Sequence, residues 1–186
     1  MFQERFILTV VGKDHPGIVA GIANTLYGYG CNIHELNQTV LSDEFAMILL
    51  LQPTRDINIK ELDEGLKNRC EELDVTYALR TATIMPVSNA QPSKDKLIIT
   101  VIGSDKIGII SGVTSILADM NVNIIELSAQ PYTIRDLNQY AVVARVEVED
   151  DLDMLNLSKA LDDCAKRLSV EIEIQSQEIF KAMHKV

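Results

Sequence analysis

The chain has 186 residues, 47% of them hydrophobic, and a formal net charge of −10. This length fits two domains of about ninety residues, and the apolar content indicates globular cores rather than disorder. The halves are charged alike, with 7 basic and 12 acidic side chains in residues 1–91 and 10 and 15 in residues 92–186, so neither half is a basic arm for nucleic acid.

The first half predicts the order strand, helix, strand, strand, helix, strand, at residues 6–11, 16–28, 32–41, 44–51, 59–73 and 75–85. The first strand is a β-branched apolar run, and apolar residues recur at helical spacing in both helices. Pro16 suits the first turn of a helix, where its missing N–H costs nothing. Gly28 and Gly30 are expected to end that helix, and Pro53 to end the third strand.

The second half predicts the same order at residues 97–102, 109–120, 123–130, 139–148, 157–168 and 170–180. Pro131 is expected to close the second strand of this copy. The offset between matching residues grows from 91 to 95, which places four extra residues in the hairpin around 132–138, where loops absorb insertions. Residues 86–95 are polar with two prolines and predict a linker between domains 1–85 and 96–186.

The repeated order predicts an α+β fold in each copy. Two right-handed crossovers and a central hairpin give a ferredoxin-like βαββαβ domain, with a four-stranded antiparallel sheet and two helices on one face.

A loop with Asp and Gly joins the first strand to the first helix in both copies, at Gly12–Val19 and Gly103–Ile110. Backbone N–H groups at a helix start are unpaired and carry partial positive charge, which suits a carboxylate. The Asp either caps the helix, which is its commoner role, or accepts hydrogen bonds from a ligand ammonium. The glycines Gly17 and Gly108 permit either close helix packing or close approach of a ligand. Together these groups suit a zwitterion such as a free amino acid.

Signals for catalysis, metals and export are missing from the sequence. There is no Ser-His-Asp signature, G-x-S-x-G motif or P-loop, and neither the histidines nor the cysteines have metal-ligand spacing. We therefore expect no catalytic residue, no metal and no cofactor. Three isolated cysteines argue against a disulfide framework, so we expect free thiols. No signal peptide or apolar run of about 20 residues is found, so we expect a cytoplasmic protein that spans no membrane.

With residues Val11–Val19, Gly30–Ile33 and their counterparts from Gly103 and Asn121, the chain resembles the ACT domain family of small-molecule-binding regulatory modules. The resemblance covers nearly the whole chain as two tandem copies. In ACT domains that bind amino acids, the residue two before the loop Pro and the Asn that opens the second strand contact the ligand across a pair of domains.

This resemblance implies a set of candidate ligand-binding residues, namely Asp14, His15, Gly17, Ile18, Val19, Asn32, Ile33, Asp105, Gly108, Ile109, Ile110, Asn123 and Ile124. The second copy departs from the family pattern because Ile107 stands in place of the loop Pro and Asn121 in place of Gly30. It is therefore expected to be the weaker or silent site.

Within the family, the chain resembles the tandem, enzyme-free members that repress transcription of the glycine cleavage system. That resemblance implies an amino-acid sensor, with glycine favoured, that acts through a protein partner such as a DNA-binding transcription activator and not by touching DNA. It also implies a homo-oligomer or an intramolecular domain pair. The alternative is a regulatory subunit of an amino-acid or one-carbon metabolic enzyme, which the same loop motivates. Direct DNA binding is disfavoured because each half carries −5.

Overall fold

A computed structural model describes residues 4–82, 95–134 and 137–177. The chain divides into two compact units, Met1–Val87 (unit 1) and Ser88–Val186 (unit 2). Of the predicted linker 86–95, only Asp95 lies within the described residues, and it belongs to a strand.

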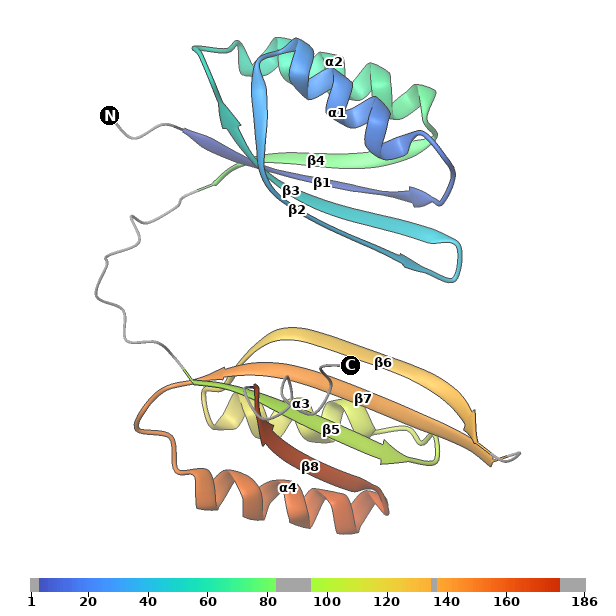
Figure 1. Ribbon diagram of the computed structural model, residues 1–186, viewed down its shortest axis with the longest axis vertical. Coiled ribbons are helices and arrows are strands. Elements are labelled where there is room, and N and C mark those ends of the chain that lie inside the picture. The colour runs from blue at the N-terminus through green and yellow to red at the C-terminus, as the bar shows by residue number, and fades with distance from the viewer. Residues whose placement is uncertain (1–3, 83–94, 135–136, 178–186) are drawn as a thin grey trace. The chain divides into compact units, whose positions relative to one another are not determined.

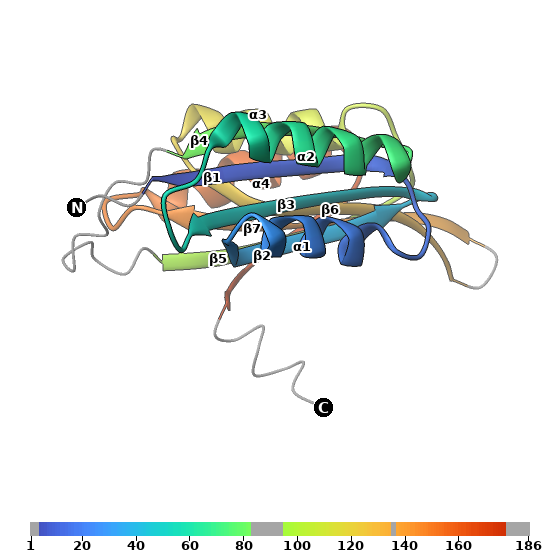
Figure 2. The ribbon, with the colours of Figure 1, turned by 90° about the horizontal axis from the view of Figure 1, so that it is seen from above.

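Unit 1 has the predicted order of elements, which are β1 (Arg5–Lys13), α1 (Ile18–Gly28), β2 (Cys31–Leu41), β3 (Glu44–Pro53), α2 (Ile59–Glu72) and β4 (Val75–Ala82). The four strands form one antiparallel sheet in the order β2-β3-β1-β4. Both helices lie side by side on one face of this sheet (Figures 1 and 2). No helix among the described residues of this unit covers the other face, which we call the open face of unit 1.

Unit 2 repeats this arrangement with β5 (Asp95–Gly103), α3 (Ile109–Asp119), β6 (Asn123–Ile134), β7 (Leu137–Val148), α4 (Met154–Leu168) and β8 (Glu171–Ser176). Its antiparallel sheet has the matching order β6-β7-β5-β8, again with both helices on one face (Figure 1). The predicted fold, two ferredoxin-like βαββαβ domains, is therefore confirmed.

Each unit buries its own hydrophobic core between the helices and the sheet. In β1, Phe6, Leu8 and Val10 are at most 2% exposed, which follows from the two-residue period of a strand that presents one face to the helices. In α1, Ile22 and Leu26 are completely buried at the helical spacing of four. The core of unit 2 is built from the corresponding positions.

The hairpin of unit 2 differs from the prediction. Pro131 was expected to close the strand, but β6 continues to Ile134, and its pairing with β7 extends as far as Leu137. The extra residues of this copy therefore lengthen a two-stranded ribbon and not an open loop. The proline is tolerated because β6 is an edge strand of the sheet.

Three further predicted bounds are corrected at strand and helix ends. Helix α1 begins at Ile18, so Pro16 lies before the helix and not in its first turn. Strand β3 includes Pro53. Strand β8 ends at Ser176, because residue 177 is no longer strand. Strand β4 is described as far as Ala82, and the predicted residues 83–85 and 178–180 lie outside the described residues.

The three cysteines are free and buried. Burial raises the pKa of the Cys31 thiol and raises that of Cys70 to about 11, which keeps both thiols protonated and unreactive at neutral pH. Among the residues that the structure describes, no helix is long and apolar enough to cross a membrane.

Candidate ligand-binding site

The first helix of each unit begins at a glycine, and no side chain caps it. Gly17 precedes α1 with φ 105° and Gly108 precedes α3 with φ 100°, both in a region that favours glycine. The second helices differ, because the Asn58 side chain accepts a hydrogen bond from Lys60 N–H and the Asp153 side chain accepts from two N–H groups of α4. The capping role considered for the loop aspartates is therefore wrong.

Close helix packing, one of the two roles that the sequence suggested for these glycines, does not explain them. A Cβ at Gly17 would meet nothing within 4 Å, and one at Gly108 would be 3.8 Å from Leu168, so close helix packing does not require glycine at either position. Their positive φ is what requires it. The space beside Gly17 is left open to solvent.

The N–H groups at the helix starts remain available to a ligand. The first helical hydrogen bonds run from Gly21 N–H to Gly17 O and from Gly112 N–H to Gly108 O, both at 2.8 Å. The backbone N–H groups of residues 18–20 and 109–111 therefore precede the first helical hydrogen bond of their helix. The side chains of Ile18 and Ile109, among the candidate ligand-binding residues, are at most 2% exposed and pack in the cores. Only the backbone of these two residues can therefore contact a ligand.

Val19 and Ile110, the next candidates, have exposed side chains. Ile33 and Ile124, at the start of the second strand of each unit, are half-buried and pack against the core.

The Asp14 loop is held against the neighbouring hairpin. Asp14 N–H donates to Asp43 O at 2.7 Å, and Asp43 belongs to the two-residue turn between β2 and β3. Ser42 and Asp43 have φ of 49° and 69°, as a type I′ hairpin turn requires. The side chains of Asp14 and Asp105 are exposed and form no hydrogen bond within the described residues, so both carboxylates are free to receive a ligand ammonium.

His15 is engaged with the protein itself. Its Nε2 lies 2.8 Å from Leu73 O at the end of α2, and its Nδ1 lies 3.1 Å from Pro16 O. These two carbonyls raise the pKa of His15 above its usual 6.5, because only the protonated ring donates to both. Lys106, which stands in place of His15 in unit 2, donates from Nζ to Leu168 O at 3.1 Å at the end of α4. His15 and Lys106 thus both tie their loop to the end of the second helix, a structural role that the sequence did not indicate.

Asn32 lies at the opposite end of the sheet from Asp14. In the register of β3, Lys13 pairs with Glu44 and Asn32 pairs with Gln52. At about 3.4 Å per residue, these two pairs are roughly 27 Å apart along the sheet. The predicted loop and strand parts of the site are therefore not brought together within one unit.

The family departures in unit 2 leave the backbone of the loop unchanged. Ile107, in place of Pro16, is fully exposed, and the helix start at Gly108 has nearly the same φ as that at Gly17. Asn121 adopts φ 56° where Gly30 adopts 73°, and Asn is the non-glycine residue that tolerates this region. The expectation of a silent second site therefore finds no support in the loop geometry.

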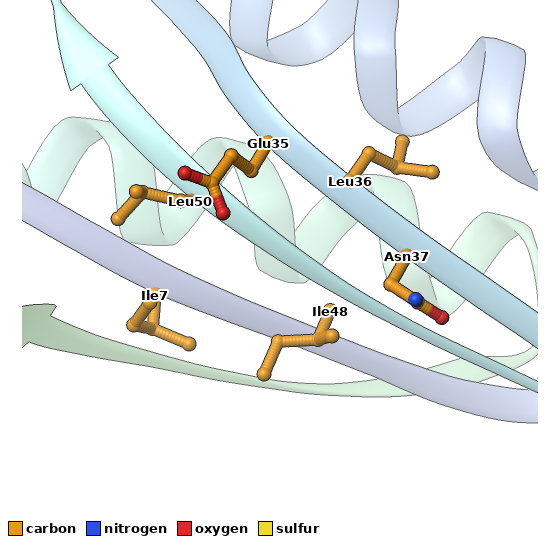
Figure 3. A pocket seen from close by; sticks show the side chains of 6 residues that line it. All are labelled: Ile7, Glu35, Leu36, Asn37, Ile48 and Leu50. Atoms are coloured by element: carbon orange, nitrogen blue, oxygen red, sulfur yellow. The ribbon is translucent and has the colours of Figure 1, made fainter. Parts of the chain in front are cut away.

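A second feature, which the sequence did not indicate, is a hollow of about 460 Å³ on the open face of unit 1. It is lined by Ile7, Glu35, Leu36, Asn37, Ile48 and Leu50 (Figure 3). None of these residues belongs to the candidate ligand-binding set. Within the described part of the chain, no group of three or more His, Cys, Asp or Glu residues is suited to hold a metal ion.

Comparison with known proteins identifies the repeat. A family model described as the ACT domain matches residues 4–79 and 95–175. A UPF0237 protein of Methanopyrus kandleri is 43% identical over 74 residues, which cover 39% of this chain and 82% of that protein. A UPF0237 protein of Clostridium acetobutylicum is 40% identical over 92 residues, which cover 49% of this chain and 99% of that protein.

Two solved structures share the fold over nearly the whole chain. A protein of unknown function from Galdieria sulphuraria superposes with a TM-score of 0.79 at 23% identity, over 94% of this chain and 98% of that one. A candidate glycine cleavage system transcriptional repressor superposes with a TM-score of 0.70 at 21% identity, over 95% of this chain and 98% of that one. At these identities, the similarity shows a common fold.

Proposed function

The chain belongs to the ACT domain family, with regulatory modules in both halves, and on that premise we propose that it senses a free amino acid and passes the bound state to a protein partner. Glycine is the first candidate ligand. The family relationship establishes a regulatory fold, and the ligand and the partner are the proposed parts.

One observation carries the proposal: in both units, the first helix start lacks a side-chain cap while the second helix start has one. An uncapped helix start offers N–H groups to an external carboxylate. Beside each such start stands an exposed aspartate, Asp14 or Asp105, that can accept from an ammonium. An α-amino acid carries the carboxylate and the ammonium on the same carbon atom, which matches this pairing of donors and acceptor.

Completion of the site requires a second ACT domain. Because Asn32 lies roughly 27 Å from the Asp14 loop along its own sheet, we propose that the Asn of one domain faces the loop of another. A ligand held in this way binds the paired domains more tightly than the unpaired ones. It can shift the equilibrium between paired and unpaired domains only by this difference in affinity. The bound amino acid would thereby change the surface offered to a partner.

We further propose that the partner is a DNA-binding transcription activator and that the chain represses genes of the glycine cleavage system. Support comes from the shared tandem fold with a candidate repressor of that system. The net charge of −10 disfavours direct contact with DNA phosphates. Repression through a protein surface requires no basic face.

A second candidate function is a regulatory subunit of an amino-acid or one-carbon metabolic enzyme. The UPF0237 relatives favour it, because one ACT unit of this chain corresponds to almost the entire length of several of them. A protein made of a single ACT domain can bind to and regulate different enzymes. Affinity purification of the tagged chain distinguishes the two, since one function predicts a transcription factor and the other a metabolic enzyme.

Isothermal titration calorimetry with glycine, serine and other amino acids tests the ligand. We expect one of them to bind with measurable heat and to raise the unfolding temperature. The same protein is then used in a pull-down from source cells with and without that amino acid, in which partner recovery should change. Absence of heat and of a thermal shift for every amino acid would remove the ligand from the proposal.

A further inference from the structure

The open face of unit 1 contains a row of residues that is apolar in the middle and carries one charge at each edge. The strand registers place Glu35, Leu50, Ile7 and Arg80 in one row across β2, β3, β1 and β4. Each of the four points away from the helices, because the residues next to Ile7 and Leu50 in sequence are the buried ones. The next row brings Ile48 to the middle of the face, where it is 46% exposed.

Both edge charges in this row are unpaired. Glu35 and Arg80 are exposed, and neither forms an ion pair or hydrogen bond within the described residues. They lie on the two edge strands of the sheet, three strand spacings or about 14 Å apart at 4.8 Å per spacing. The hollow described above lies between Glu35 and Asn37 on β2 and the apolar residues of β3 and β1 (Figure 3).

Unit 2 satisfies the corresponding carboxylate internally. Glu126, the counterpart of Glu35, forms a 2.8 Å ion pair with Arg145 Nη2. Leu50 occupies the register position of Arg145 in unit 1, and Gln175 occupies that of Arg80 in unit 2. Unit 1 therefore lacks the arginine next to its glutamate and has an arginine at the far edge of the same row.

We propose that the open face of unit 1 binds the same face of a second copy of the chain, with Arg80 of each copy paired to Glu35 of the other. A two-fold axis parallel to the strands, between β3 and β1, places β4 of one copy over β2 of its partner. In the shared row, it sets each arginine opposite a glutamate and sets Ile7 opposite Leu50. Sheets packed face to face lie about 10 Å apart, a gap that the extended Arg and Glu side chains can bridge together.

The hollow beside Glu35 then receives the arginine. The alkyl stem of Arg80 from the second copy lies over Ile48 and Leu50, and its guanidinium reaches Glu35, as Arg145 reaches Glu126 within unit 2. A two-fold interface repeats every contact, so each dimer contains two such pairs. This inference concerns the open face alone and does not depend on an amino-acid ligand.

A second copy is the occupant that the charges favour. A row with an acid at one edge, a base at the other and apolar residues between is complementary to itself under this rotation. The corresponding face of unit 2 is not, because its edge strand β8 carries Glu171, Glu173 and Gln175 and no base. Self-association is therefore specific to unit 1.

Charge reversal tests the pairing in the full-length chain. We expect wild-type protein to be dimeric by sedimentation velocity, and Glu35→Arg or Arg80→Glu to weaken the dimer by at least about tenfold, because each places like charges opposite one another twice. A mixture of the two variants should restore dimers, since one chain then presents two arginines to two glutamates of the other. Circular dichroism checks that both variants are folded.

Glu64→Arg is the matched control, because this exposed glutamate lies on α2, on the helix side of the unit. It should leave the dimer unchanged. If the chain covers the face with its own residues or leaves it to another protein, the wild type stays monomeric at all concentrations, which overturns the proposal. Dimers that survive both reversals, or variants that do not recombine, overturn it as well.

Discussion

His15 Nε2 lies 2.8 Å from Leu73 O, and Lys106 Nζ lies 3.1 Å from Leu168 O at the same place in unit 2. In each unit, the loop after the first strand thus places a basic side chain at the C-terminal end of the second helix. A cation is favourable there because the last carbonyls of a helix are unpaired and carry partial negative charge. The two residues differ in chemistry, but both tie the candidate ligand-binding loop to a helix.

The first prediction is that the stability of unit 1 depends on pH through His15. Its folded pKa is raised above 6.5, so its contribution to stability is fully present below pH 6.5 and is lost as pH rises through the folded pKa. His15→Lys should remove this dependence while keeping the contact. Lys106→His should transfer the dependence to unit 2. Chemical denaturation across pH 5–9, followed by amide resonances of each unit, measures both, and an unchanged pH profile in His15→Lys would contradict the assignment.

The second prediction concerns backbone strain at the end of α4. Ser169 adopts φ 54° and ψ 52°, a left-handed conformation that costs a non-glycine residue about 1 kcal/mol. Ser169→Gly should therefore stabilise unit 2 by up to that amount. The matched control is Ser115→Gly, at an exposed position inside α3, which should destabilise unit 2 by roughly 0.5–1 kcal/mol. Urea denaturation gives both values, and a loss of stability in Ser169→Gly would show that the serine is preferred there.

Strand and helix positions were predictable from the sequence because burial imposes a period on it. The alternation through Phe6, Leu8 and Val10 identifies β1, and the spacing of Ile22 and Leu26 identifies α1. Features that depend on tertiary neighbours were not predictable. The partner of His15 is 58 residues away, and the strand can pass through Pro131 only because β6 is an edge strand.

The candidate site was predictable in part. The repeated loop pointed to the helix starts, and the structure provides the uncapped amides there. The side chains of Ile18 and Ile109 are buried, as their helical spacing with other apolar residues predicted, so only their backbone can contact a ligand. Both residues begin a helix, so the side chain enters the buried face while the backbone N–H precedes the helical hydrogen bonds.

The third prediction is that glycine at position 17 is required by its backbone conformation and not by space. Gly17→Ala introduces a Cβ that meets nothing within 4 Å, but at φ 105° it should cost about 1–3 kcal/mol of the stability of unit 1. Gly28→Ala is the control, because its Cβ also meets nothing and Gly28 lies at the end of a helix, without a positive φ. Thermal denaturation compares them. Equal stabilities in the two variants would contradict a conformational requirement at position 17.

The fourth prediction separates ligand binding by Asp14 from helix capping. Because the Asp14 side chain caps no helix, Asp14→Ala should leave the stability of unit 1 nearly unchanged. If Asp14 accepts from a ligand ammonium, the same change should weaken amino-acid binding by about 1.5–3 kcal/mol, the range for hydrogen bonds to charged groups. Calorimetry and denaturation of one protein sample provide both quantities.

Asp153→Ala is the control, because it should lower stability and leave ligand affinity unchanged. Its carboxylate accepts from Leu155 N–H at 3.1 Å and Asn156 N–H at 3.0 Å, so its loss should destabilise α4 by about 1 kcal/mol. Within unit 2 it caps the start of α4, whereas the Asp105 loop lies at the other end of this helix, where Lys106 contacts Leu168, so ligand affinity at that loop should not change. An Asp14→Ala protein that behaves like Asp153→Ala, less stable but with wild-type affinity, would assign Asp14 a structural role and remove it from the site. If Asp14→Ala instead keeps its stability and binds the amino acid more weakly, the result supports the uncapped helix start as the site of the amino acid carboxylate.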